Sequence, residues 1–205
     1  MPRTKAQFAE MRRLTNEKVL SAAIAVFSRK GFAAAAVHEI ATAAGISTGL
    51  MYRHYASKEE LFQALVNQAA LGMLEVAQLF QRDLPPRQLI EAFAQEFLTD
   101  LANGDEFAQL LALMTQVFMM EDAAPKVEQL TAANQVLLEA TTRLIQKGQW
   151  LGQFKAGDPE VMAAYYFATI QGLGILKFTM KERFVVPTLD IVNAFLIKEQ
   201  DGHGS

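Results

Sequence analysis

The side chains best suited to chemistry are concentrated in one short run of the sequence, from Ser47 to His54. The run combines hydroxyl groups, a guanidinium and an imidazole, which are groups that proteins use to hydrogen-bond phosphates and base edges. Bond-making chemistry has little support. The chain has no cysteine, its three histidines (His38, His54 and His203) are scattered, and it shows neither paired carboxylates at a catalytic spacing nor a phosphate-binding glycine loop. We therefore expect a binding protein without a metal or cofactor, and not an enzyme.

The local pattern around this run predicts a helix-turn-helix. Val37 to Ala44 reads as a short helix that buries its apolar side chains, and a tight turn follows at Gly45. Ser47 suits the cap of a second short helix, because its hydroxyl can accept a hydrogen bond from a free backbone N–H. Met51 and Tyr55 lie four residues apart and are expected to face the core, which leaves the polar residues of that helix outward.

Two further helices are expected to hold this pair in place. Asn16 to Lys30 has apolar residues at three- and four-residue spacing, and Gly31 ends it. Ser57 and Glu60 form a capping-box pattern at the start of a long helix that runs to about Leu84. That helix begins beside the helix-turn-helix and continues into the rest of the chain, so we expect it to connect the two parts mechanically.

The charge of the chain is unevenly distributed. Residues 1–62 carry nine lysines and arginines against five acids, a balance of +4, and the remainder therefore carries −7 of the overall charge of −3. A basic end on an acidic body is typical of a protein that touches a nucleic acid with that end only. Charge alone leaves chance clustering of solvated side chains equally open.

The remaining sequence predicts an all-α fold of about nine helices, with no strand and no internal repeat. After the long helix we expect one that ends at Asn103, then Asp105–Met119, Ala124–Lys147, a helix from Asp158 to about Lys181, and Thr188–Lys198. The chain is thus divided into a flexible basic arm (1–14), a helix-turn-helix domain (15–61), a helical body for ligand binding and dimerisation (62–200) and a disordered tail (201–205).

The sequence also bears on where the protein is found. The N-terminus lacks the apolar core of a signal peptide, because charged residues recur between Arg3 and Arg13. The longest uncharged stretch, Val161 to Leu176, has 16 residues, fewer than the roughly 20 that span a bilayer. We therefore expect a cytoplasmic protein with no membrane segment.

Several pieces of the first 62 residues follow the order and spacing of a known family. They are Val19–Ala23 with Phe27, then Gly31–Phe32, then Ile40–Ala41, and above all the run AGISTGLMYRHYASKEEL from Ala44 to Leu61. Together they resemble the tetracycline-repressor (TetR) family of bacterial one-component regulators. Beyond Leu61 the resemblance lies in length and helix count, and in Gly152–Phe154 ahead of Gly157–Pro159, which looks like the usual start of the eighth helix. It implies a dimeric DNA-binding transcriptional regulator.

Two residues depart from the pattern of that family. Ala36 stands where a threonine or serine usually caps the second helix, and loss of such a cap costs about 1 kcal/mol. We therefore expect the second helix to fray until DNA binds. Leu50 replaces a commoner small or hydroxyl-bearing residue, which favours contact with a thymine methyl group over a hydrogen bond to a base.

The resemblance implies that the helix beginning at Ser47 enters the major groove of operator DNA. The candidate DNA-binding residues are His38, Ser47, Thr48, Gly49, Leu50, Tyr52, Arg53, His54 and Lys58. Thr48, Leu50 and Arg53 are expected at base edges, Gly49 lets the backbone approach, and the others are expected at phosphates. The alternatives are that Tyr52 is a half-buried core aromatic and that His38 is an exposed bystander.

The body is expected to pair two chains. The helix Val161–Phe178 is apolar nearly all round and rich in small residues. A helix of this kind must be covered on every side, and one chain of this size covers only one side. With the helix Thr188–Lys198 it resembles the family's dimer seam, which implies a homodimer and a pseudo-palindromic operator.

The body also carries many aromatic and methionine side chains. The candidate ligand-binding residues are Phe93, Phe97, Met114, Gln116, Phe118, Trp150, Tyr165, Tyr166 and Gln171. For any single one, ordinary core packing is the favoured alternative. Together they suit an adaptable apolar pocket, as the resemblance implies, so the expected effector is a small, lipophilic molecule that releases a repressor from DNA. The competing hypothesis is a DNA-binding dimer whose body docks a protein partner and binds no small molecule.

Overall fold

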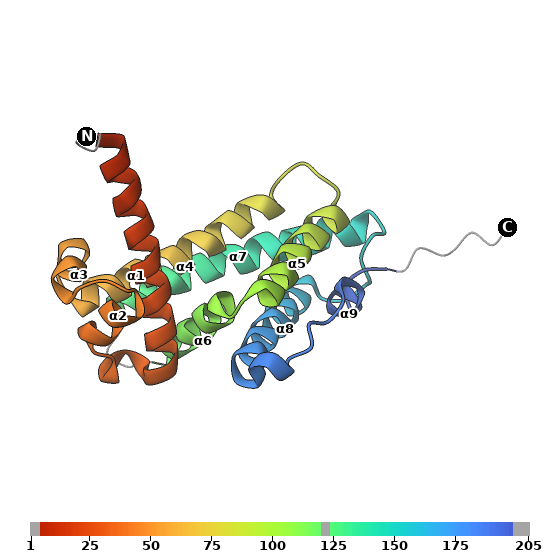
Figure 1. Ribbon diagram of the computed structural model, residues 1–205. Coiled ribbons are helices and arrows are strands. Elements are labelled where there is room, and N and C mark those ends of the chain that lie inside the picture. Colours follow the sequence, from red (N-terminus) through yellow and green to blue (C-terminus); the bar gives the residue numbers. More distant parts are fainter. Residues whose placement is uncertain (1–4, 120–123, 199–205) are drawn as a thin grey trace.

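The computed structural model describes residues 5–119 and 124–198, and these form an all-α fold (Figure 1). Within those ranges there is no β-strand, only an isolated bridge between Phe154 and Ile197. The helices are α1 (Lys5–Ala34), α2 (Val37–Ala43), α3 (Thr48–His54), α4 (Lys58–Phe80), α5 (Pro86–Asn103), α6 (Glu106–Phe118), α7 (Ala124–Trp150), α8 (Pro159–Met180), the 3-10 helix η1 (Lys181–Arg183) and α9 (Leu189–Asn193). The predicted fold class is confirmed.

Helix α1 begins earlier than expected and replaces most of the predicted flexible arm. It is helical from Lys5, and its N-terminal turns project away from the rest of the molecule (Figure 1). The packed part of the helix provides the nucleus, so the extension adds turns without a new nucleation cost. Arg13 supports these turns through ion pairs with Glu10 and Glu17. Residues 1–4 of the expected arm and the expected tail 201–205 lie outside the described residues.

A kink at Gly31 separates the long part of α1 from its last turn. Gly31 has a φ of 75°, a conformation that costs glycine little and other residues much more. The chain then turns into α2, which crosses back under α1. The expected end of this helix before Gly31 is therefore found as a sharp change of direction.

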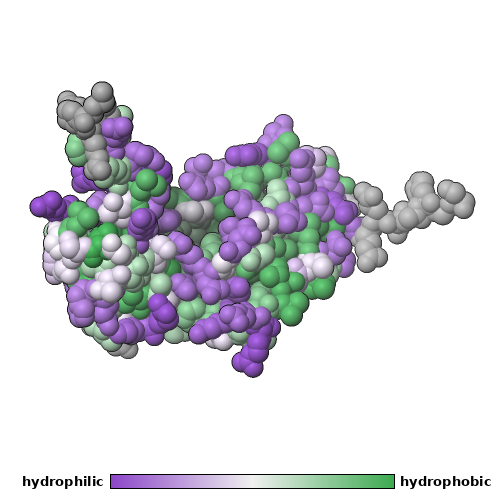
Figure 2. Space-filling model, viewed as in Figure 1, coloured by the Kyte–Doolittle hydropathy of each residue, from purple (hydrophilic) through white to green (hydrophobic). Residues whose placement is uncertain are grey.

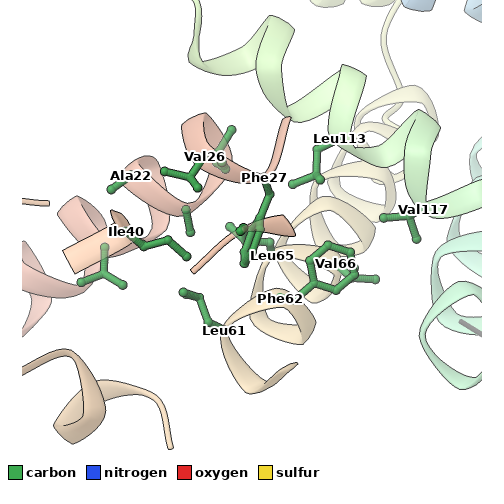
Figure 3. Packing of buried hydrophobic residues seen from close by; sticks show 14 of the residues in the cluster. Ala22, Val26, Phe27, Ile40, Leu61, Phe62, Leu65, Val66, Leu113 and Val117 are labelled. Atoms are coloured by element: carbon green, nitrogen blue, oxygen red, sulfur yellow. The ribbon is translucent and has the colours of Figure 1, made fainter. Parts of the chain in front are cut away.

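The first core is the cluster of buried residues around Phe27 and Phe62, and it joins the helix-turn-helix to the body. Figure 3 shows Phe27 of α1 and Phe62 of α4 near Leu113 and Val117 of α6. The rings of Phe27 and Phe62 meet edge to face, with centroids 5.5 Å apart. The start of α7 contributes Leu130 to the same cluster. The packing does not divide at residue 61, where the sequence analysis drew its domain boundary.

The second core fills the other end of the molecule. It is the cluster of buried residues that includes Phe80, Ile90, Phe97, Tyr166 and Leu196, from α4, α5, α8 and the segment after α9. Helices α4 and α7 run side by side and contribute to both cores. This agrees with the expectation that the long helix α4 links the helix-turn-helix to the body.

The last helix is much shorter than predicted. We expected Thr188–Lys198, but α9 ends at Asn193. Beyond it the chain makes a turn, in which the amides of Leu196 and Ile197 both donate to the carbonyl oxygen of Asn193, and its backbone then pairs with residues 153–155. The amide of Lys155 donates to the carbonyl oxygen of Leu196 at 2.8 Å, and the amide of Lys198 donates to that of Gln153 at 3.0 Å.

Candidate functional site

The inner side of α3 is fixed by capping and burial. The Ser47 hydroxyl accepts a hydrogen bond from the amide of Leu50 at 3.1 Å, as its position predicted. Met51 is buried in the first core. The Tyr55 hydroxyl donates to the side-chain oxygen of Asn16 on α1 at 2.8 Å, and burial raises the pKa of that hydroxyl. These contacts hold α3 rigidly against α1.

The outer side of α3 presents a polar face to solvent. Thr48, Gly49, Tyr52 and Arg53 are all exposed, and their spacing puts them on one side of the helix. The side chain of Tyr52 is 51% exposed, so the alternative that it is a core aromatic does not hold. Leu50 and His54 are half-buried at the edges of this face, and His38 is exposed on α2.

Lys58 does not lie on this outer face as expected. Its ammonium group turns inward and donates to the carbonyl oxygens of Phe32 at 2.8 Å and Ala35 at 3.1 Å. It also lies 4.5 Å from the centroid of the Phe32 ring. Carbonyl oxygens near the C-terminal end of a helix favour a nearby cation. We therefore replace the predicted phosphate contact with a role in joining α4 to the end of α1.

The start of α2 is held although Ala36 has no capping side chain. Glu39 accepts a hydrogen bond from the amide of Ala36 at 3.2 Å, which satisfies one free donor of the first turn. Glu39 also forms an ion pair with Lys30 of α1. The hydrogen bond from Lys30 and that from Ala36 hold the pKa of the Glu39 carboxyl below its ordinary value. The expected fraying of α2 is thus opposed by a contact that the sequence analysis missed.

The aromatic residues predicted to bind a ligand are partly brought together in the second core. The Phe93 ring lies 6.1 Å from that of Tyr166 and 6.0 Å from that of Phe167. The Phe97 ring packs edge-on against Phe107. Tyr166 is fully buried, and its hydroxyl has no hydrogen-bonding partner among the described residues.

Three other candidates lie away from that core. Trp150, the last residue of α7, is 84% exposed, and Phe118 near the end of α6 is also exposed. Tyr165 is exposed because it points to a different face of α8 from its buried neighbour Tyr166. An aromatic side chain in the sequence therefore does not by itself show whether the residue lies on the buried face of a helix, on its outer face or at its end.

Met114, Gln116 and Gln171 connect helices instead of lining the second core. Met114 is buried in the first core. The Gln116 amide of α6 donates to the carbonyl oxygen of Ser28 on α1 at 3.0 Å. The Gln171 amide of α8 donates to the hydroxyl of Thr115 on α6 at 2.9 Å. The adjacent residues Thr115 and Gln116 therefore bridge α8 and α1 through α6.

A further polar contact joins the same helices, and sequence reasoning did not identify it. The Ser21 hydroxyl of α1 donates to the carboxylate of Glu106 on α6 at 3.0 Å. The partners are 85 residues apart, so no local pattern relates them. Contacts of this kind make α6 the main body helix in contact with α1.

The outward side of α8 is apolar. Val161, Ala164, Tyr165 and Ala168 are exposed along it, and Figure 2 shows hydrophobic residues gathered over α8 and the neighbouring α9. By length and composition alone, residues Pro159–Arg183 form a helix that is long and apolar enough to cross a membrane. Of its most apolar 18-residue stretch, 28% is buried within the chain. An apolar surface of this kind is unfavourable in water unless another molecule buries it.

Comparison with known proteins identifies the family. Residues 19–65, which contain α2, α3 and the start of α4, match the model of bacterial regulatory proteins of the tetR family. These residues match the DNA-binding region of the TetR family. Members of the TetR family are transcriptional regulators and not enzymes.

The relatives cover different parts of the chain. It is 30% identical over 98 residues to the uncharacterized HTH-type regulator YerO of Bacillus subtilis, over 46% of this chain and 34% of YerO. It is 26% identical to the A-factor receptor protein of Streptomyces griseus, over 80% of this chain and 55% of the receptor. The matches thus span about a third and about half of the length of these TetR-family relatives.

Solved structures match the whole fold. The complex of SmeT with triclosan is 26% identical, covers 92% of this chain and 93% of SmeT, and has a TM-score of 0.66. A second SmeT structure, with 26% identity, 91% coverage of both chains and a TM-score of 0.60, is described as the repressor of a Stenotrophomonas maltophilia multidrug efflux pump. The TetR-family architecture therefore extends beyond residue 65.

Proposed function

We propose that this protein is a cytoplasmic homodimer that binds a pseudo-palindromic operator and represses transcription until a small, mostly apolar ligand releases it. The observation that carries the proposal is the exposed polar face of α3, held on a helix whose inner side is capped and buried. The TetR-family match over residues 19–65 supports the same reading.

The DNA contacts follow from the exposed face of α3. Arg53 and Thr48 are proposed to read base edges in the major groove, and Leu50 to contact a thymine methyl group. Tyr52, His54, His38 and Ser47 are proposed to fix the register through phosphates. Gly49 has open space in front of it, so the backbone of α3 can approach the DNA closely.

The dimer is proposed to form through the outward apolar side of α8. The exposed residues of this side include small ones, which allow two such helices to approach each other closely. A second copy of the chain would cover the surface that otherwise faces water. The shortened α9 changes the expected seam, because only Leu189–Asn193 of the predicted Thr188–Lys198 helix is available to join it.

Ligand control is proposed to act on the second core and to reach the DNA-binding end through α4 and α6. The complex of the similar protein SmeT with triclosan supports a lipophilic effector. The ligand would favour a geometry of the body in which the two copies of α3 no longer match successive major grooves.

A second function is favoured by one observation. Trp150 is almost fully exposed, and its neighbour Leu151 is also exposed. Exposed tryptophan is typical of protein interfaces. A body that docks a protein partner through this corner remains the competing hypothesis. This hypothesis would be favoured if small molecules failed to release the purified protein from DNA.

Selection of operator DNA from a random pool, followed by binding measurements on variants, tests the main proposal. Arg53→Ala should relax the preference at one base pair per half-site by about 1–3 kcal/mol. Tyr52→Ala should weaken binding to all selected sequences. Arg143→Ala, an exposed arginine on α7, is the matched control and should bind like the parent. Failure to select any sequence, or unchanged binding by Tyr52→Ala, would refute the placement of α3 on DNA.

A further inference from the structure

The second core contains polar atoms that nothing in the described chain satisfies. The hydroxyl of Tyr166 and both side-chain polar atoms of Asn193 are buried and have no hydrogen-bonding partner among the described residues. Tyr166 is 0% exposed and Asn193 is 2% exposed. A buried polar group without a partner lowers stability, so folded proteins rarely keep one without a functional reason.

The ring of Tyr166 has three other aromatic rings as neighbours. The rings of Phe93, Phe167 and Phe195 lie 6.1, 5.7 and 6.1 Å from that of Tyr166. Each of these three rings is only partly buried. These rings are therefore the groups that a molecule from solvent would displace to reach the Tyr166 hydroxyl.

The charges nearby argue against an ionic ligand. The buried polar residues among the described ones are Ser28, Thr141 and Asn193, and none of them is charged. Glu96 and Asp100 of α5 face solvent. An ion bound beside Tyr166 would lose its hydration without gaining a counter-charge. Burial also raises the pKa of the Tyr166 hydroxyl, so this group stays protonated and acts as a donor.

We propose that the effector is a neutral, mostly apolar molecule that carries a hydrogen-bond acceptor such as a carbonyl group, and that the Tyr166 hydroxyl donates to this acceptor. The proposal rests on the ligand-controlled function given above and specifies the chemistry of its ligand. Asn193, at the end of α9, offers a second buried hydrogen-bonding group that has no partner among the described residues.

Phe195 connects this site to the proposed dimer face. Its ring lies 6.1 Å from that of Tyr166 and 4.7 Å from that of Tyr165. Tyr165 is exposed on the outward side of α8. A ligand that displaces Phe195 would therefore disturb its ring contact with Tyr165, which lies on the proposed dimer face.

Matched pairs of small probes test the proposal on the full chain. The probes are acetophenone with ethylbenzene, and benzophenone with diphenylmethane. In each pair the hydrocarbon has a CH2 group where the ketone has its carbonyl group. Binding is followed by calorimetry and by the shift in melting temperature. Each ketone should bind the parent protein more tightly than its hydrocarbon, and Tyr166→Phe should weaken ketone binding about five- to tenfold while leaving hydrocarbon binding unchanged.

Tyr165→Phe is the matched control, because it removes the same hydroxyl from the exposed neighbour. It should keep the full preference for ketones. Without a probe, Tyr166→Phe should melt at a higher temperature than the parent. Tyr165→Phe should not, because Tyr165 is exposed to water, whereas the Tyr166 hydroxyl is buried without a partner.

The outcomes separate the two proposals. Equal binding of ketone and hydrocarbon to the parent, no binding of either, or a ketone preference that survives in Tyr166→Phe would overturn the ligand assignment. So would binding of choline in place of the ketones, which would indicate a cation held by the rings. Operator binding is measured separately on the probe-free protein. Its absence would refute the regulator function even if the ketone preference were found.

Discussion

The hydrogen-bonding partners of Lys58 in this structure lie far from it in the sequence. Its ammonium group is held by carbonyls of Phe32 and Ala35. We expect Lys58→Ala to lower the free energy of unfolding by about 1–3 kcal/mol. The salt dependence of operator binding should keep its slope, because no phosphate contact is lost.

The comparison for this test is Arg53→Ala, measured by urea unfolding and by operator binding at several salt concentrations. Arg53 is exposed, so its removal should leave stability unchanged and alter binding. If Lys58→Ala were as stable as the parent and reduced the salt slope by about one unit, the phosphate role would be correct after all.

Glu39 makes the anchoring of α2 sensitive to acid. Its carboxyl pKa is held below the ordinary value of 4.5 by the hydrogen bond from Lys30 and by that from the Ala36 amide. A group with a lowered folded-state pKa stabilises the fold above the unfolded value and loses that contribution as pH falls through the folded value. Glu39→Gln should therefore be less stable than the parent at pH 7.

The difference in melting temperature between Glu39→Gln and the parent should shrink as the pH falls below about 4, where the parent carboxyl is protonated as well. Glu17→Gln is a suitable control, because Glu17 pairs with Arg13 on the projecting turns of α1 and does not contact α2. A pH-independent difference for Glu39→Gln would contradict the ionic role.

At the scale of residues, the sequence was informative where the partner is local. Ser47 and Met51 were placed correctly because a cap and a helical period involve residues within one turn. Lys58, in contrast, bonds backbone carbonyls 23 and 26 residues earlier. Every residue has such carbonyls, so sequence alone does not mark them as acceptors.

Among the elements, α6 has the contacts best suited to transmit a change in the body to the helix-turn-helix. Through Gln116 and Glu106 it bonds α1, and through Thr115 it bonds α8. We expect Gln116→Leu to lower the free energy of unfolding by about 1 kcal/mol and to weaken operator binding, because α1 loses its support. Gln109→Leu on the same helix should change neither quantity. Equal effects of the two variants on operator binding would show that α6 does not act through Gln116.

The ends of elements were the least predictable part of the fold. The apolar spacing after Thr188 suits a helix to Lys198, yet the pairing with residues 153–155 gives the same backbone groups other partners. Conversely, residues 5–14 lack a buried stripe and still continue α1. Local periodicity predicts a helix only where no tertiary contact competes and no neighbouring helix extends into the segment.

For the whole molecule, the outward side of α8 decides whether two chains associate. Ala168→Glu places a charge on that apolar side and should shift the protein to monomers in sedimentation experiments. Operator affinity should then fall by about a hundredfold or more, since the two half-sites are no longer bound together. Ala92→Glu, on the exposed side of α5, makes the same change elsewhere and should remain dimeric. A dimeric Ala168→Glu protein would exclude this seam.

The shared first core has a consequence for protein engineering. Leu113 and Val117 of α6 and Leu130 of α7 complete the packing around Phe27 and Phe62. A chimaera that grafts residues 1–61 onto another body would leave behind the side chains that fill this space, and a mismatch would create cavities or clashes. A functional exchange of DNA specificity is better made by replacing the exposed residues of α3 alone, or by carrying the facing turns of α6 and α7 along with the graft.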